Sequence, residues 1–170
     1  MKENVNDINQ KSQRKMKRPE QSRTEHVQIV FPAHTNGSNR LFGGQLMQWI
    51  DIVAAVVARR HSESNVTTAC IETVTFTAPA FVDDTIYLSG IITYAGRTSM
   101  EVRVETWSET LSGGRHSLNT AYLTLVAIDE NNIPVQVPGL IISTEDEKCL
   151  WEQAVLRRQI RESMQNNSPC

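Results

Sequence analysis

The chain has 170 residues, of which 39% are hydrophobic and 21% are charged, and this balance is typical of a globular protein that buries one core. Its formal net charge of −2 and its pI near 6.1 give no reason to expect a nucleic-acid or membrane-surface partner. The longest apolar stretch, residues 49–58, contains Asp51 and is far shorter than the ~20 residues that a membrane-spanning helix needs. We therefore expect one folded domain whose partners depend on the chemistry of its site.

The cysteine content predicts a reducing environment. Cys70, Cys149 and Cys170 are an odd number without the spacing of a metal or redox motif, and no apolar segment near the start resembles a secretory signal. We expect a cytoplasmic protein in which these cysteines have packing or incidental roles.

The first 24 residues are polar and include a cluster of basic side chains. They show neither helical nor alternating apolar periodicity, and Glu3, Asp7 and Glu20 argue against a transit peptide. We expect residues 1–24 to form a disordered, solvated tail. Its basic cluster consists of Lys11, Arg14, Lys15, Lys17 and Arg18.

The body opens with a strand and a long helix. Residues 26–31 are a strand candidate that Pro32 ends, and turn-forming residues follow over 33–40. Residues 42–61 predict a helix, because apolar side chains recur there at steps of four, three and four and so share one face. These side chains are Leu46, Ile50, Val53 and Val57.

A second face of this helix combines one carboxylate with small side chains. Gly44, Asp51, Ala54, Ala55 and Ala58 lie within about 60° of one another at 100° per residue. Small side chains leave room beside the carboxylate, so we expect something to adjoin Asp51.

Four segments rich in β-branched and aromatic residues predict strands over residues 67–77, 85–93, 99–108 and 116–128. The connections between them are too short to hold crossover helices, so these strands must pair largely as antiparallel neighbours. About five antiparallel strands with one long apolar helix make an α+β layer in which the helix forms the core, the arrangement called the hotdog fold.

A second helix follows the sheet. Thr144 and Glu147 form a capping-box pattern that starts a helix extending to about residue 164. Its charged side chains indicate a solvated face, with Leu150, Trp151 and Ala154 directed inward or toward a partner subunit. The charged side chains are Glu145, Glu147, Lys148, Glu152, Arg157, Arg158, Arg161 and Glu162. We divide the chain into a tail (1–24), a folded domain (25–140) and a helical extension (141–170).

Several common catalytic motifs are missing from the sequence. It contains no GxSxG, GxxxxGK[ST] or HExxH pattern, which removes the usual basis for a serine hydrolase, a phosphate-binding loop or a zinc protease. The four histidines show no ligand spacing, so we expect no metal site. They are His26, His34, His61 and His116.

The segment from residue 31 to residue 51 contains the strongest candidate site. Gly43 and Gly44 stand at the predicted helix start, where free N–H groups and the helix dipole favour an oxygen that gains negative charge. Asp51 follows two turns later and can activate water, which Asn36 can orient. Spacing alone leaves a structural alternative open, in which Asp51 is simply hydrogen-bonded and the two glycines close a tight loop.

This segment resembles the signature of the acyl-CoA hydrolase family of hotdog thioesterases from bacteria and mammals. That signature reads roughly Pro-x-Asp-x-Asn, a Gly, then Phe or His before Gly-Gly, and an Asp in the helix. The similarity extends over residues 25–140 and includes Val74-Thr75-Phe76 with Pro79 after it. It also includes the turn Gly96-Arg97-Thr98-Ser99 and the strand that follows it.

The resemblance implies hydrolysis of acyl-CoA to a fatty acid and CoA, with no further cofactor. It implies that Asn36 and Asp51 are the catalytic pair, that they meet across a homodimer interface, and that dimers often assemble as trimers of dimers. It also implies that CoA binds near Arg97, Thr98 and Ser99, and a guanidinium with two hydroxyls suits phosphates. The chain departs from the signature at His34, where the family usually has an acid.

We interpret Asp51 as a general base on water, Asn36 as the group that positions it, and the Gly43 and Gly44 backbone as the oxyanion hole. Direct attack by Asp51 through an anhydride is the alternative chemistry. One rival function is a non-catalytic acyl-CoA sensor that binds DNA, for which residues 1–24 lack a helix-turn-helix pattern. The other is dehydration of hydroxyacyl thioesters, for which His34 is the only candidate partner of the carboxylate. The preferred acyl chain length depends on how the sheet and a partner subunit enclose the acyl chain beside the small-residue face of the helix, and the sequence does not predict it.

Overall fold

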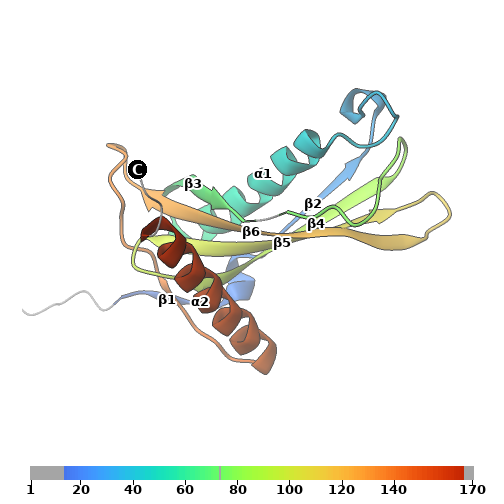
Figure 1. The fold of residues 1–170 in the computed structure, drawn as a ribbon. Coiled ribbons are helices and arrows are strands. Elements are labelled where there is room, and N and C mark those ends of the chain that lie inside the picture. The colour runs from blue at the N-terminus through green and yellow to red at the C-terminus, as the bar shows by residue number, and fades with distance from the viewer. Residues whose placement is uncertain (1–13, 73, 167–170) are drawn as a thin grey trace, which may run out of the picture.

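The structure is a computed structural model that describes residues 14–72 and 74–166. A curled five-stranded antiparallel sheet packs against the long helix α1 (Gly43–Ser62), and the helix α2 (Glu145–Asn166) lies on the other side of the sheet (Figure 1). This is the α+β hotdog arrangement expected from the sequence. Within the described residues, neither helix is long and apolar enough to cross a bilayer.

The order of the strands explains why α1 forms the centre of the domain. The strands are β2 (Thr24–Ile29), β3 (Asn65–Ile71), β4 (Thr85–Ala95), β5 (Ser99–Glu109) and β6 (Arg115–Ile128). Their order across the sheet is β2-β4-β5-β6-β3, so β2 and β3, the first two strands of this sheet along the chain, form its two edges. Because α1 connects these edge strands, it crosses one face of the sheet from edge to edge.

The apolar face of α1 forms the core. Leu46, Ile50, Val53 and Val57 are at most 3% exposed, which confirms the face predicted from their spacing. Each such side chain contributes roughly 1.5–3 kcal/mol on burial. A Cβ on Gly90 of β4 would lie 2.7 Å from Val53 Cγ1 and 2.9 Å from Val57 Cγ2, so glycine is what allows α1 to approach the sheet here.

The N-terminal segment is ordered from residue 14 onward, so the expectation of a disordered tail is wrong for residues 14–24. Strand β1 (Met16–Lys17) pairs in parallel with β7 (Gly139–Leu140), and a 3-10 turn, η2 (Pro19–Ser22), leads into β2. Lys17 is buried, and its Nζ donates to the carbonyls of Arg60 and His61 at 2.8 and 2.9 Å, where it caps the C-terminus of α1. Residues 1–13, with Lys11, lie outside the described residues.

The strand expected over residues 67–77 is shorter than predicted. It ends at Ile71 after a bulge between Thr68 and Cys70 that shifts its register against β6. Beyond that point the backbone N–H groups of Glu72 and Thr77 each donate to β6 at 2.9 Å, outside the ladder of β3. The irregular segment leads to Pro79, which has no N–H to donate.

Helix α2 begins as predicted but presents part of its charged surface to the sheet. Thr144 and Glu147 form the capping box, with Glu147 N donating to Thr144 Oγ1 at 3.2 Å and Thr144 N donating to Glu147 Oε2 at 3.1 Å. Arg157 was expected on the solvated face. It instead forms a bidentate pair with the buried Glu101, at 3.1 Å from Nε and 2.7 Å from Nη2.

Candidate active site

Asp51 lies in the middle of α1, facing the edge strand β3, and is half-buried. Thr68 of β3 donates from Oγ1 to Asp51 Oδ1 at 2.7 Å. Among the described residues, Asp51 Oδ2 has no hydrogen-bond donor. The carboxylate is therefore held in place through one oxygen while the other remains available to accept a proton.

The small residues around Asp51 serve partly to pack the core. Ala54 and Ala58 are fully buried against the sheet, so these two side chains let α1 pack closely. Asp51 and Ala55 are half-buried, so the room predicted beside the carboxylate stays a prediction for that side of the helix.

Asn36 lies in the loop between β2 and α1, in a turn that its own side chain stabilises. Asn36 Oδ1 accepts the backbone N–H groups of Ser38 at 2.9 Å and Arg40 at 3.2 Å, and Asn36 N donates to Arg40 O at 2.8 Å. These contacts assign the amide orientation, which leaves the Nδ2 group without an acceptor among the described residues. Asn36 is exposed and can donate two hydrogen bonds to a ligand.

The N-terminus of α1 has free backbone donors. The first intrahelical bond runs from Leu46 N to Phe42 O at 3.1 Å, and Phe42 supplies no side-chain cap. The N–H groups of Gly43 and Gly44 therefore have no acceptor within the described chain. A Cβ on Gly44 would lie 2.5 Å from Phe42 Cε1, so any larger residue here would displace the exposed ring of Phe42.

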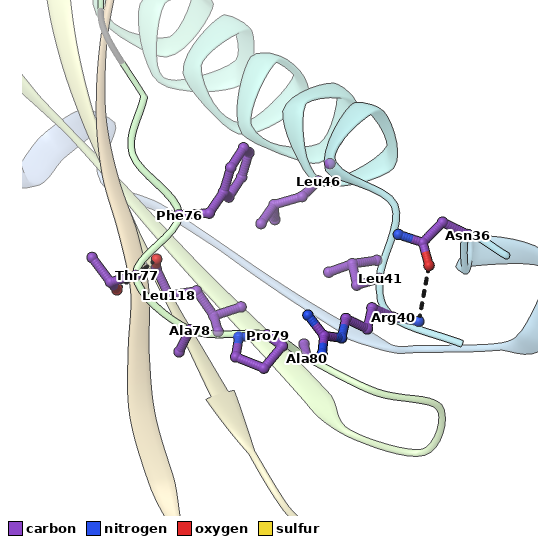
Figure 2. A pocket seen from close by; sticks show the side chains of 11 residues that line it. Asn36, Arg40, Leu41, Leu46, Phe76, Thr77, Ala78, Pro79, Ala80 and Leu118 are labelled. Carbon is purple, nitrogen blue, oxygen red and sulfur yellow. Dashed lines mark hydrogen bonds between the residues drawn. The ribbon is translucent and has the colours of Figure 1, made fainter. Parts of the chain in front are cut away.

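A cavity of about 350 Å³ connects the Asn36 loop with the start of α1 (Figure 2). On its other side are the irregular segment after β3 and Leu118 of β6. Its lining brings Asn36 and Gly43 together but does not include Asp51. The lining residues are Asn36, Arg40, Leu41, Gly43, Leu46, Phe76, Thr77, Ala78, Pro79, Ala80 and Leu118.

The turn expected to bind CoA lies far from this cavity within one chain. Arg97, Thr98 and Ser99 stand at the start of β5, whereas the cavity lies toward the other end of α1 and of the sheet. At about 3.3 Å per residue, β5 alone spans roughly 33 Å. The side chain of Arg97 is exposed, with no hydrogen bond or ion pair to another described residue. One chain therefore places the three predicted groups in three separate regions.

The histidines have structural contacts. His34 Nδ1 accepts the N–H of Phe31 at 3.2 Å, and its ring packs edge-on against Trp49 at 5.1 Å between centroids, so within one chain His34 is not paired with Asp51. His61 is fully buried with Nε2 at 3.0 Å from Pro138 O, and burial lowers its pKa. Among residues 14–72 and 74–166, no cluster of His, Cys, Asp or Glu side chains could hold a metal ion.

Two parts of the site were missed in the sequence. Thr68 was assigned only to a strand, because its contact with Asp51 joins that strand to the helix across 17 positions and has no local sequence signal. The cavity wall at residues 76–80 was assigned to a strand end and a connection, and its role depends on the bulge at Thr68, which has no clear sequence signature.

Comparisons with known proteins identify the family. Residues 38–113 match the thioesterase superfamily. The uncharacterized acyl-CoA thioester hydrolase YkhA of Bacillus subtilis is 38% identical over 149 residues, which cover 87% of this chain and 87% of that protein. An uncharacterized acyl-CoA thioester hydrolase of Zymomonas mobilis is 42% identical over 117 residues, which cover 66% of this chain and 76% of that protein.

Solved structures agree with the sequence relatives. A hexameric acyl-CoA thioesterase has a TM-score of 0.87 and 39% identity, covering 91% of this chain and 99% of that chain. The acyl-CoA hydrolase of Staphylococcus aureus, solved with butyryl coenzyme A and coenzyme A, has a TM-score of 0.82 and 32% identity, covering 88% and 92%. The chain therefore belongs to the acyl-CoA thioester hydrolases of the thioesterase superfamily and is a thioester hydrolase with the hotdog fold.

Proposed function

We propose that this protein hydrolyses acyl-CoA to a carboxylic acid and free CoA, with Asp51 as the general base. Asp51 Oδ2 takes a proton from water as the water oxygen attacks the thioester carbonyl. The tetrahedral intermediate then expels the CoA thiolate, and the thiolate takes up the proton that Asp51 gained, which restores the carboxylate. The observation that carries the proposal is the carboxylate held at Oδ1 by Thr68, with Oδ2 free of donors within the described chain. The reaction needs water and no cofactor, because CoA is part of the substrate and the product.

Asn36 and the start of α1 are suited to the other half of the reaction. The free Nδ2 of Asn36 can donate to the attacking water or to the thioester oxygen. The N–H groups of Gly43 and Gly44 point out of the positive end of the helix dipole and can stabilise the oxyanion. Asn36 and Gly43 share one cavity, which supports their acting on the same carbonyl group.

We propose that each site is built by two chains, with Asn36 of one chain facing Asp51 of its partner. The separation of these residues in one chain supports this arrangement. So does the free edge of β3, since an unpaired strand edge beside apolar side chains is a surface for another chain. Ile52, which follows Asp51 on α1, and Ile71 at the end of β3 are 48% and 40% exposed. A related thioesterase is hexameric, and we propose a trimer of dimers for this protein.

We propose that Arg97, Thr98 and Ser99 bind the phosphates of CoA. An exposed guanidinium without a carboxylate partner, next to two hydroxyl groups, suits phosphate recognition. Within one chain this turn lies far from the cavity, which fits a CoA molecule that lies across an interface between two chains. A cytoplasmic location is part of the same proposal, since acyl-CoA is the substrate.

Thr68 acts as a positioning residue for Asp51 in this proposal. Structures of S. aureus acyl-CoA hydrolase include variants in which one aspartate, one asparagine or one threonine is replaced by alanine. The three replaced residues have the same spacing along the chain as Asn36, Asp51 and Thr68 here. This correspondence supports Thr68 as the third member of the site.

The proposal is tested by measuring release of the CoA thiol from a panel of acyl-CoAs of increasing chain length. The wild type should release CoA, and Asp51→Asn should lower kcat by about two to four orders of magnitude without loss of folding. Retained activity in Asp51→Asn would contradict the assignment. Single-turnover hydrolysis in oxygen-18 water tests the anhydride alternative, because label that enters Asp51 would contradict the general-base step.

A further inference from the structure

The turn Gly96 to Ser99 is fixed to neighbouring backbone while its Arg97 side chain is exposed. Gly96 N donates to Ser99 O at 2.8 Å and closes the turn between β4 and β5. Arg97 O accepts the N–H of Val137 at 3.0 Å, which ties the turn to the loop before β7. The backbone of the turn therefore depends on how that loop is held.

Arg14 holds this junction from the N-terminal segment. Its Nε donates to Val137 O at 3.0 Å, and its Nη2 donates to Gly96 O and is 3.4 and 3.5 Å from the carbonyls of Pro138 and Ala95. One half-buried guanidinium thus binds carbonyls of two segments that are distant in the sequence, residues 95–96 and 137–138. A planar guanidinium fork can do this, whereas a lysine ammonium has only one donor centre.

Arg158 approaches the same turn from α2. Its Nη1 donates to Tyr94 Oη at 2.7 Å and would lie 3.1 Å from a Cβ on Gly96, so the guanidinium lies directly against the turn. Its Nε is paired with Glu162 at 2.7 Å. The turn is therefore contacted by one arginine from each terminal extension of the domain.

The charges at the turn are not balanced. Arg158 is paired with Glu162, but neither Arg14 nor Arg97 has an ion pair with a carboxylate among residues 14–72 and 74–166. The turn thus carries one guanidinium without a carboxylate partner, on Arg97, and is contacted by a second, on Arg14, in a chain whose formal net charge is −2. Such a local excess of positive charge favours a polyanionic ligand such as the phosphates of CoA.

We infer that Arg14 and Arg158 are positioning residues for CoA: they hold the turn in the conformation in which Arg97, Thr98 and Ser99 receive its phosphates. Arg14 also adds positive charge beneath the turn. This inference rests on the proposed role of the turn in binding CoA. It assigns a function to one residue of the basic N-terminal cluster and to one residue of α2, both of which had been assigned to solvent.

The test compares two substrates with the same acyl group, acyl-CoA and acyl-pantetheine, which lacks the nucleotide phosphates. In the full-length protein, Arg14→Gln and Arg158→Gln should each raise KM for acyl-CoA about three- to tenfold with little change in kcat. KM for acyl-pantetheine should stay unchanged. Lys15→Gln and Lys148→Gln are matched controls, because each removes an exposed cation from the same segments, paired with Glu63 and Glu145.

Parallel measurements on Arg97→Ala separate this inference from the proposed function. If Arg97→Ala raises KM for acyl-CoA but Arg14→Gln and Arg158→Gln do not, the inference is wrong and the CoA site stands. If none of the three variants changes KM while the wild type hydrolyses acyl-CoA, both the CoA site and the inference are wrong. If the Gln variants affect both substrates alike, their role is structural and the inference is again overturned.

Discussion

Replacing Thr68 with valine removes one hydroxyl from the site and little else. Valine has nearly the same shape, and Thr68 lies on a strand, where a β-branched side chain is favoured. The lost interaction is a 2.7 Å hydrogen bond to the Asp51 carboxylate, which carries a charge in the proposed role as base, and bonds to charged groups contribute about 1.5–3 kcal/mol. At ~1.4 kcal/mol per tenfold, full loss lowers the rate about 10- to 100-fold. Because the half-buried carboxylate can recruit water instead, we expect kcat to fall about tenfold.

The assay is steady-state release of the CoA thiol, with urea unfolding as the measure of stability. Thr67→Val is the matched control, since the exposed Thr67 is the adjacent residue on the same strand and points to the opposite face. Thr67→Val should keep wild-type kcat, and Thr68→Ser should keep most of it. Equal kcat in Thr68→Val and Thr67→Val would refute the idea that Thr68 positions the base.

Three further predictions follow from other parts of the molecule. Arg97→Ala should raise KM for acyl-CoA more than it lowers kcat, because a contact remote from the thioester is made equally in the ground and transition states; a kcat loss alone would contradict this. Glu101→Gln should lower the free energy of unfolding in urea by about 2–4 kcal/mol, because it leaves Arg157 without its buried carboxylate; a change below about 0.5 kcal/mol would contradict this. Burial lowers the pKa of His61 in the folded protein, so the unfolded chain binds a proton more readily. The free energy of unfolding should therefore decrease as the pH drops below about 6.5, and His61→Gln should show a smaller decrease between pH 6.5 and 5.

Local patterns predicted the main elements. The steps between Leu46, Ile50, Val53 and Val57 defined the buried face of α1, because helix periodicity and burial agree there. Short connections predicted antiparallel pairing, and the capping box at Thr144 located the start of α2. The position of β3 at the far edge, beside β6, was not predictable from the order of strands along the chain.

The errors arose where distant segments meet. The basic N-terminal residues were predicted to be solvated because their partners are distant in the sequence. Lys17 donates to the carbonyl of Arg60 at the end of α1, and Arg14 donates to the carbonyl of Gly96. Arg157 looked exposed because Glu101 lies 56 positions earlier. Tertiary pairing decided the burial of each of these charges, and local polarity did not.

The candidate site was predicted only in part. Asn36, Gly43 and Asp51 were named from the sequence, and the structure brings the first two together in one cavity while Asp51 lies outside it. Thr68 was missed, because its contact to Asp51 joins a strand to the helix across 17 positions. The proposal of a site shared between two chains follows from this separation.

The most direct measurement of the central claim mixes two inactive proteins, Asn36→Ala and Asp51→Ala, after subunit exchange has been verified with differently tagged chains. If each site takes Asn36 from one chain and Asp51 from its partner, every mixed dimer has one intact site and one site that lacks both residues. Random exchange makes about half of the dimers mixed, so activity should recover to about a quarter of the wild type. If exchange is complete and the mixture stays inactive, the two residues do not form a shared site.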